Sequence, residues 1–379
     1  MDLGGTKIEG IVLELHKTSL RAPEGRSSPQ SVGESSPPKH RRVRLRSLAD
    51  NPAFEIASVA SLPRNDDLVE VFRKRIDTQQ EEGYEAILNR IKNLYEDLVK
   101  GAGLKGAWPL QRPDNGARPH QVRPEGPEAH TLGIGTPGAV SRRTGLLKNS
   151  NTVCMNGKPV RDDLKKLLQR DFVIENDANC FALAEALYGA GKGKNFVFGV
   201  IMGTGCGGGI VHQGKIVAGL QSIAGEWGHM SMDPRGPLCY CGARGCVETF
   251  ISGGGLEKRY LKEFGQKKTL KEIVADYRKD KGLFSGVRPH SERGLTPLDT
   301  VCFMETFFKH YGRALANLIN VLDPEIVVLG GGGSNIDELY TEGYEEVRKA
   351  VFSDSLETPI VKNQLGDSAG VIGAALIGN

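Results

Sequence analysis

A histidine and three cysteines lie within eighteen residues of the sequence, and they constrain that segment more tightly than any other feature constrains the chain. They are His229, Cys239, Cys241 and Cys246, separated by nine, one and four residues. Four nitrogen and sulfur ligands form the closed tetrahedral set of a structural Zn²⁺, with no position left for water. The spacing is not that of a DNA-reading zinc finger, so we expect the metal to fix a long loop, residues 226–248. Free buried thiols are the alternative, although the glycines between the cysteines are poor core material.

Composition excludes several classes of protein. The 379 residues are 39% hydrophobic and 25% charged, and they contain no run of about 18 apolar residues, so no membrane helix is expected. The first residues lack the basic and apolar segments of a secretory signal. Seven cysteines form an odd set, and those outside the cluster are scattered, which suits a reducing compartment. We therefore expect a cytoplasmic protein.

One segment supplies the positive charge. Residues 17–50 carry eight lysines and arginines against three acidic residues, whereas the whole chain has a formal net charge of +3. The rest is slightly acidic, so we expect no nucleic-acid partner. This segment is also rich in serine and proline and cannot bury enough apolar surface to offset its ordering entropy. We predict disordered inserts at about 17–65 and, from a similar composition, at about 105–130.

Hydrophobic patterns predict an α/β protein. Short apolar runs that end in glycine or in a polar turn indicate strands at 8–15, 68–76, 130–136, 172–176, 195–202 and 325–330. A further strand is predicted after the glycine turn that follows residue 202, ending by residue 217. A helix is predicted over 84–103, because Ile87, Ile91, Leu94 and Leu98 fall on one face. A second helix follows residue 177, and an apolar helix ends the chain.

Three glycine-rich turns follow predicted strands. Glycine lets backbone N–H groups approach phosphate oxygens closely, a threonine hydroxyl adds a donor, and an aspartate can hold hydrated Mg²⁺. Each turn alone could be an ordinary hairpin or strand-to-helix turn. Together they predict a nucleotide site, whose expected residues are Asp2, Gly4, Gly5, Thr6, Lys7, Gly203, Thr204, Gly205, Gly207, Gly208, Gly209, Gly331 and Gly332.

Carboxylates provide the remaining chemistry. Phosphoryl transfer to an alcohol needs a group that accepts the hydroxyl proton, and Asp177, which follows a strand and opens a helix, suits that role. Its alternative role is an acid that stabilises the first helical turn. Asn176 could bind a substrate hydroxyl or shape the turn. Glu226 and Glu248 flank the predicted metal ligands and are expected to face the substrate; the alternative is that they are surface acids.

In this order the segments DLGGTK, GTPG, ENDANC, GTGCGGG, GEWGH, CYCGARGCVE and LDPEIVVLGGG resemble the ROK family of sugar kinases (repressors, open reading frames and kinases). The resemblance implies an actin/hexokinase-like (RNase H-like) α/β fold with two lobes that close on ATP and a sugar. It divides the chain into a small N-terminal lobe (1–136), a large lobe with the metal loop (137–366) and a C-terminal helix returning to the small lobe (367–379).

The resemblance also assigns roles to residues. Asp177 would be the catalytic base, and the sugar would be bound by Asn151, Asn176, Asp177, Glu226, His229 and Glu248. His229 would serve the metal and the sugar with one ring nitrogen each, which an imidazole permits. ATP, Mg²⁺ and a structural Zn²⁺ are the implied cofactors, and a homodimer is the implied assembly.

Within the family the chain looks most like bacterial fructokinases that also accept mannose. This implies phosphorylation of D-fructose to fructose 6-phosphate. Glucokinases and N-acetylhexosamine kinases share the catalytic residues and are the alternative, and a non-catalytic sugar-binding regulator is a further one. Three features depart from the family pattern. Asp2 has almost no strand before it, the inserts at about 17–65 and 105–130 are foreign to the pattern, and the nine residues between His229 and Cys239 are few.

Overall fold

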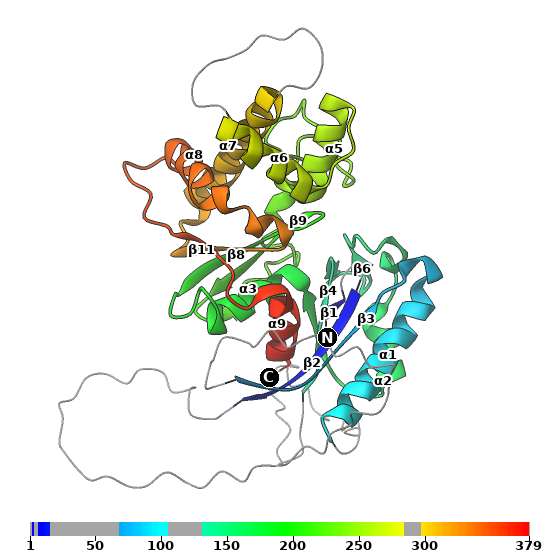
Figure 1. Ribbon diagram of the computed structural model, residues 1–379. Helices are drawn as coiled ribbons and strands as arrows, with labels where there is room; N and C mark the ends of the chain where they lie inside the picture. The colour runs from blue at the N-terminus through cyan, green and yellow to red at the C-terminus, as the bar shows by residue number, and fades with distance from the viewer. Residues whose placement is uncertain (1, 4–6, 16–67, 105–130, 284–296, 379) are drawn as a thin grey trace, which may run out of the picture. The chain divides into compact units, whose positions relative to one another are not determined.

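The computed structural model describes residues 2–3, 7–15, 68–104, 131–283 and 297–378 (Figure 1). The predicted inserts at 17–65 and 105–130, together with Gly4, Gly5 and Thr6, lie outside the described residues. The stretches up to Leu13 and from Glu70 onward belong to one compact unit. None of the helices within the described ranges has the length and apolar character needed to cross a membrane.

The first sheet has five strands in the order β3-β2-β1-β4-β7. Their bounds are β1 (Asp2–Leu3), β2 (Lys7–Leu15), β3 (Leu68–Asp77), β4 (Gly133–Thr136) and β7 (Val173–Asn176). β1, β4 and β7 run parallel, so their carboxyl ends meet at one edge of the sheet. Across these three strands Asp2 pairs with Gly135, and Gly135 pairs with Glu175. The strand that contains Asp2 and the strand that leads to Asp177 are therefore separated only by β4.

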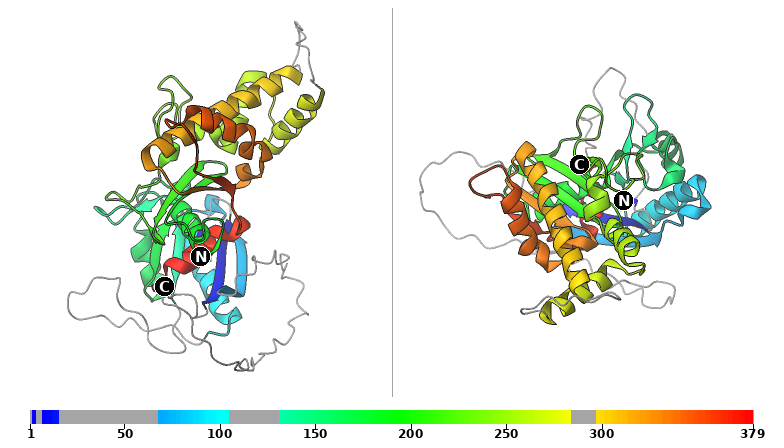
Figure 2. Two further views of the ribbon diagram at one scale, coloured as in Figure 1. Left: turned by 90° about the vertical axis from the view of Figure 1, so that its left-hand side faces the viewer. Right: turned by 90° about the horizontal axis from the view of Figure 1, so that it is seen from above.

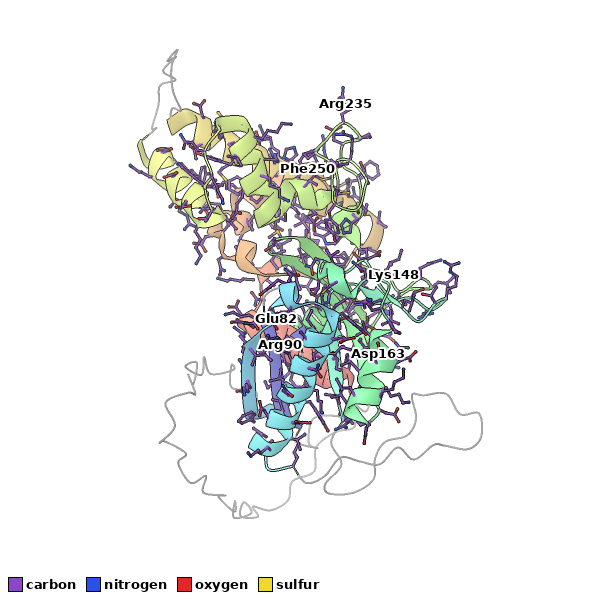
Figure 3. The ribbon with its side chains drawn as sticks, turned by 90° about the vertical axis from the view of Figure 1, so that its right-hand side faces the viewer. Glu82, Arg90, Lys148, Asp163, Arg235 and Phe250 are labelled. Carbon is purple, nitrogen blue, oxygen red and sulfur yellow. The ribbon has the colours of Figure 1, made fainter. Side chains whose placement is uncertain are left out.

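Two helices share a hydrophobic core with this sheet. They are α1 (Tyr84–Gly101) and α2 (Val160–Leu168), and the short helix η2 (Gln80–Glu82) precedes α1. The predicted face of α1 is confirmed, because Ile87, Ile91, Leu94 and Leu98 are all buried. Glu82 and Arg90 form an ion pair at 2.5 Å at the start of this helix (Figure 3).

The second sheet has the order β10-β9-β8-β11-β12. Its strands are β8 (Phe196–Met202), β9 (Cys206–His212), β10 (Lys215–Ile216), β11 (Ile326–Gly330) and β12 (Ile360–Lys362), and a separate hairpin joins β5 (Ala139–Val140) to β6 (Leu147–Lys148). β8 pairs antiparallel with β9 and parallel with β11. The turns that follow β8 and β11 are thus neighbours at the same sheet edge.

Helices α3 (Asp177–Tyr188) and α9 (Ala369–Ile377) pack against each other (Figure 1). α3 also contacts β8 and β9, and α9 contacts β4. The close approach depends on small residues: a Cβ on Gly373 would lie 1.8 Å from the Cys180 carbonyl oxygen, and one on Gly209 would lie 2.5 Å from that of Ala178. α3 is buried on all sides from Ala178 to Ala186, as expected of a helix with apolar residues around its whole circumference.

A helical layer covers the second sheet (Figure 2). It consists of α4 (Val247–Ile251), α5 (Gly253–Phe264), α6 (Leu270–Leu283), α7 (Pro297–Leu322) and α8 (Glu342–Ala350). Within the described ranges, the other short helices are η3 (Val153–Met155), η4 (Trp227–His229), η5 (Gly332–Asn335), η6 (Asp337–Tyr340) and η7 (Gly366–Ser368). The sequence patterns described above did not assign this layer.

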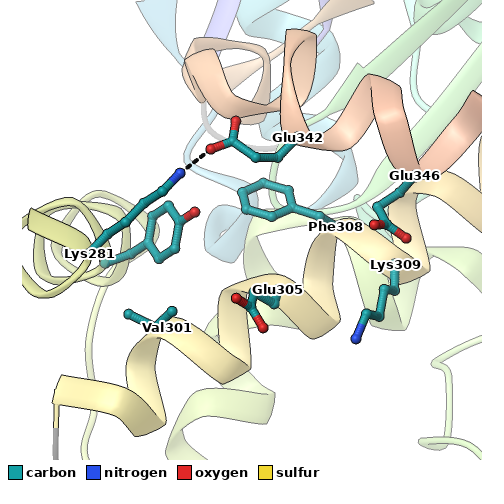
Figure 4. Close-up of a pocket in the computed structure, with 8 residues that line it drawn as sticks. Lys281, Val301, Glu305, Phe308, Lys309, Glu342 and Glu346 are labelled. Carbon is teal, nitrogen blue, oxygen red and sulfur yellow. Dashed lines mark hydrogen bonds and ion pairs between the residues drawn. The ribbon is translucent and has the colours of Figure 1, made fainter. Parts of the chain in front are cut away.

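A cavity of about 540 Å³ lies between α6, α7 and α8 (Figure 4). Phe308 and Val301 supply apolar surface, whereas Glu305 and the Lys281–Glu342 ion pair supply charge. None of its lining residues is among the site residues expected from the sequence.

The predicted division into lobes remains a prediction. β7 belongs to the first sheet, although residues 173–176 lie within the range 137–366 expected for the large lobe. The terminal helix α9 contacts β4 of the first sheet and α3, in keeping with a helix that returns toward the N-terminal part.

Candidate active site

The junction of β7 and α3 holds Asp177 at the first position of a helix. Asn176 is the N-cap, and its side-chain oxygen accepts hydrogen bonds from the backbone N–H groups of Ala178 at 2.9 Å and Asn179 at 3.3 Å. Asp177 accepts from the Ala178 N–H at 2.8 Å. The positive end of the helix dipole stabilises a carboxylate at this position. The capping role that was the alternative for these residues is therefore present, and it also fixes the carboxylate of Asp177 at the end of a strand.

Asn176 also connects two other segments. Its side-chain amide donates to the Gly138 carbonyl oxygen at 3.1 Å. Gly138 has a φ of 76°, and a Cβ there would lie 2.3 Å from the Lys148 carbonyl oxygen, so only glycine fits. The GTPG turn, the loop after β6 and the start of α3 are consequently in mutual contact.

The loop after β6 presents Asn151 as an exposed residue. Asn156 braces this loop, because its side chain both accepts from the Ser150 N–H and donates to the Ser150 carbonyl oxygen, each at 2.8 Å. Asn149 adopts a left-handed backbone with a φ of 61°. Asn156 thus has a structural role, whereas sugar binding by Asn151 stays a prediction.

The structure brings together all four predicted metal ligands. The ligand atoms of His229, Cys239, Cys241 and Cys246 lie within 4.8 Å of one another. His229 Nδ1 is 3.6 Å from Cys239 Sγ, and the sulfurs of Cys241 and Cys246 are 3.6 Å apart. A tetrahedral metal with Zn–S bonds of about 2.3 Å separates its sulfur ligands by about 3.8 Å. The donor set and its spacing therefore fit zinc.

The sulfur atoms of this cluster have unequal proton affinities. Burial raises the pKa of Cys239, and burial together with hydrogen bonds to the neighbouring thiols raises that of Cys246 to about 12. Burial acts in the same direction on Cys241, but hydrogen bonds from the Ala243 backbone and from the other two thiols lower its pKa overall. Three sulfurs that share protons in this way release them when a dication binds, because the thiolate is the ligand.

Glu248 links the metal loop to the second glycine turn. One oxygen of its carboxylate accepts from the Cys206 N–H at 3.0 Å, and the other lies 3.8 Å from Cys239 Sγ. A Cβ on Gly205 would be 2.5 Å from the Glu248 carboxylate, so the glycine admits this contact. Burial and the nearby Glu248 charge raise the pKa of the Cys206 thiol.

Glu226 belongs to the same group of charges. Burial raises the pKa of its carboxyl, the interactions with His229 and Lys148 oppose that rise, and the Glu248 charge adds to it. Lys148 also donates to the Gln221 carbonyl oxygen at 3.0 Å, which ties β6 to the segment before Glu226. Figure 3 labels Lys148, which lies in β6, and Arg235, which lies in the predicted metal loop.

Tyr240 is a site residue that the sequence reasoning missed. Its hydroxyl lies 3.2 Å from His229 Nε2, and the two rings meet edge to face with centroids 5.2 Å apart. Partial burial of the hydroxyl and the negative charges of Glu248 and Glu226 raise its pKa. Its position between two of the predicted metal ligands was the available signal, since a loop fixed at both ligands would restrict the direction of every residue between them.

The second glycine turn is shorter than its motif. Gly203 and Gly205 close the hairpin between β8 and β9, with a backbone hydrogen bond of 2.9 Å, and Thr204 between them is exposed. Gly207, Gly208 and Gly209 instead lie within β9, paired with the strand β8. A Cβ on Gly208 would lie 2.5 Å from the Trp227 ring, so packing of the loop before His229 already explains this glycine. The expectation that all five glycines form one turn is wrong, because the strand resumes at Cys206.

The third glycine turn follows β11. Gly331 has a φ of 76°, and a Cβ there would lie 2.7 Å from the Met202 carbonyl oxygen, so this turn adjoins the end of β8. Around Gly332 a Cβ would meet nothing within 4 Å, which leaves its backbone open to a ligand. Of the first turn, the structure describes the backbone of Asp2 in β1 and an exposed Lys7 at the start of β2. Nucleotide contacts at all three turns stay predictions.

Known proteins resemble this chain in sequence and in fold. The ROK family model matches residues 121–379. An N-acetyl-D-glucosamine kinase from Vibrio atlanticus (strain LGP32) is 38% identical over 256 residues, which cover 65% of this chain and 80% of the relative. A ROK hexokinase from Thermus thermophilus superposes with a TM-score of 0.64 at 27% identity, over 82% of this chain and 91% of that one.

A ROK family glucokinase from Streptomyces griseus, solved with glucose and AMPPNP, superposes with a TM-score of 0.58 at 25% identity, over 82% and 92% of the two chains. The predicted actin/hexokinase-like α/β fold is thereby confirmed. The family model and the two structural superpositions each cover more than half of the chain. The chain belongs to the ROK family of sugar kinases.

Proposed function

We propose that this protein transfers the γ-phosphoryl group of ATP to the hydroxymethyl oxygen of N-acetyl-D-glucosamine, forming N-acetyl-D-glucosamine 6-phosphate and ADP. The observation that carries the proposal is the junction of β7 and α3, where a capped helix start fixes the carboxylate of Asp177 beside the braced loop that contains Asn151. The Vibrio atlanticus relative supports the choice of sugar, since it is named for this substrate. Fructose finds no support among the relatives reported above.

In the proposed reaction, the sugar oxygen attacks the γ-phosphorus while its proton moves to the carboxylate of Asp177, and ADP leaves. A phosphoryl-transfer site works chiefly by positioning the reactants and by stabilising charge. Glu226, His229, Glu248 and Asn176 would hold the sugar hydroxyls, and the glycine turns after β8 and β11 would hold the nucleotide. Mg²⁺, with Asp2 as the candidate carboxylate, would neutralise phosphate charge. The zinc-bound loop would keep the sugar ligands in register.

A coupled assay of ADP release tests this proposal. The purified full chain is supplied with ATP and Mg²⁺ and, in turn, with N-acetylglucosamine, N-acetylmannosamine, glucose, mannose and fructose. We expect the highest kcat/KM for N-acetylglucosamine, and phosphate at the sugar C6 by NMR. A clear preference for fructose would restore the fructokinase interpretation. Absence of turnover, with sugar binding retained in calorimetry, would favour the non-catalytic sugar-binding regulator.

A further inference from the structure

The hydrogen bond between Tyr240 and His229 involves the ring nitrogen of His229 that the metal cluster does not use. The two nitrogens of a neutral imidazole differ, because one carries the proton and the other offers a lone pair. Nδ1 of His229 faces Cys239 Sγ at 3.6 Å, inside the four-residue cluster that fits zinc. A metal at Nδ1 uses that lone pair and leaves the proton on Nε2. The Nε2–H then donates to the hydroxyl oxygen of Tyr240, 3.2 Å away.

The same N–H is the group that a sugar hydroxyl would need. His229 has one ring nitrogen left after metal binding, and that nitrogen can donate one hydrogen bond along one direction. Tyr240 already lies on this direction, and its ring contacts the imidazole edge to face. A sugar oxygen that accepts from Nε2 must therefore take the place of the phenol oxygen.

Tyr240 is free enough to move aside. Its relative exposure is 64%, and it stands in the short turn between Cys239 and Cys241 rather than in a helix or strand. Glycine follows this turn at Gly242, whose φ of 91° marks the bend of the loop. The backbone of the loop is bound by the cluster, whereas the exposed ring can rotate about its side-chain torsions.

We infer that the hydroxyl of Tyr240 occupies the sugar-binding N–H of His229 in the sugar-free enzyme, and that a sugar binds His229 by displacing it. This inference rests on the proposed function for its ligand. Displacement costs the free enzyme one hydrogen bond in every state that contains sugar, the ground state and the transition state alike. A cost shared by both states changes KM and leaves kcat unaltered.

The substitution Tyr240→Phe tests the inference, because it keeps the aromatic ring against His229 and removes the competing oxygen. We expect the KM for the sugar, and its Kd by calorimetry without ATP, to fall by about two- to tenfold, the range of a single hydrogen bond. We expect kcat and the zinc content to be unchanged. Tyr344→Phe is the matched control, since it removes a hydroxyl that bonds the Leu356 carbonyl oxygen at 3.1 Å outside the metal loop. It should leave KM unchanged.

Other outcomes have definite meanings. An unchanged or raised KM in Tyr240→Phe would overturn the inference, the raised value showing that the hydroxyl binds the sugar instead of competing with it. A fall in both zinc content and kcat would also overturn it, because Tyr240 would then support the metal loop. Failure of the proposed function looks different: the wild-type chain would then phosphorylate none of the hexoses, whatever residue stands at position 240.

Discussion

At the scale of single residues, Asp177 owes its position to its neighbours. Asn176 caps the helix through two N–H groups and bonds Gly138, so the carboxylate that follows has little freedom. The acidic residue and the asparagine are visible in the sequence, which left cap and catalyst open for them. The structure shows the capping role at this junction, and capping fixes the carboxylate of Asp177. The catalytic role stays a prediction.

We predict that Asp177→Asn lowers kcat by about 10²- to 10⁴-fold, the usual contribution of a general base, and changes the sugar Kd only slightly. The amide keeps the shape of the side chain but cannot accept the hydroxyl proton. Stopped-flow turnover and calorimetry measure the two quantities. Asp171→Asn, at a side chain that is 71% exposed, makes the same chemical change on the surface and should be neutral. Normal turnover of Asp177→Asn would remove it as the base.

At the scale of elements, the predicted metal loop contains only the short helix η4 before the cysteines, and the helix α4 begins directly after Cys246. Two isolated β-bridges, Ser231 to Cys246 and Leu238 to Arg244, pair parts of its backbone. A bound ion would add to this pairing, because the binding free energy of a structural metal contributes to folding. The loop also contains Glu226, His229 and Glu248. A change that disorders the loop would therefore also disorder these candidate sugar ligands.

Zinc removal should therefore disorder this site. We predict about one zinc per chain by elemental analysis, and that chelation or Cys246→Ser lowers both Tm and sugar affinity, since structural zinc contributes folding energy. Cys302→Ser is the control, because Cys302 is an exposed free cysteine in α7 outside the cluster. A metal-free chain that is fully folded and active would contradict this account of the loop.

The helix α7 provides a second prediction at this scale. His310 lies against Phe250, with ring centroids 4.5 Å apart, and its Nδ1 is 3.3 Å from the guanidinium of Arg259. Burial, and then the charges of Arg259 and Arg313, lower the pKa of His310 to about 4, although Asp233 opposes them.

As pH falls from about 6.5, the histidine ionises in the unfolded chain before it does in the folded one. The free energy of unfolding should therefore fall between pH 6.5 and 4. His310→Gln, which cannot ionise, should flatten that decline even if packing is lost at neutral pH. Urea unfolding at pH 7 and pH 5 measures the difference. An unaltered slope in His310→Gln would refute the assignment.

At the scale of the whole molecule, Glu185 joins α3 to the segment that leads into α9. Its side chain is fully buried and accepts from the N–H groups of Ala190 at 2.9 Å, Gln364 at 3.1 Å and Leu365 at 2.8 Å. The same helix begins with Asp177. One buried carboxylate thus fixes the far end of the helix that carries the candidate base.

We predict that Glu185→Ala lowers the free energy of unfolding by about 2–5 kcal/mol, because buried N–H groups lose their acceptor. Glu185→Gln, which keeps one acceptor oxygen, should be milder. The exposed Glu325 also accepts a backbone N–H, from Asn195 at 3.1 Å, and Glu325→Gln should cost only a few tenths of a kcal/mol. Guanidinium unfolding gives the values. A neutral Glu185→Ala would show that water satisfies these N–H groups.

The sequence predicted the longer strands of both sheets, the buried face of α1 and the terminal helix, because each has a local hydrophobic pattern. The strands β1 and β12, of two and three residues, were not predicted. It also singled out the cluster of one histidine and three cysteines that the structure brings together, since a set of soft donors is recognisable without knowing the path of the loop. The helices α6 and α7 of the layer that covers the second sheet each have one apolar and one polar face, so the same reasoning could have predicted them.

Residue chemistry was therefore determined by the sequence alone: which donors can bind a metal, which carboxylate can accept a proton, and which segments must be buried. Only the tertiary structure decided which partner each group has. Tyr240 meets His229, Glu248 meets Cys206, and Glu185 meets a turn 180 residues away. These pairings have no sequence period, because they arise where separate elements pack together, and packing is fixed by the shape of the whole core.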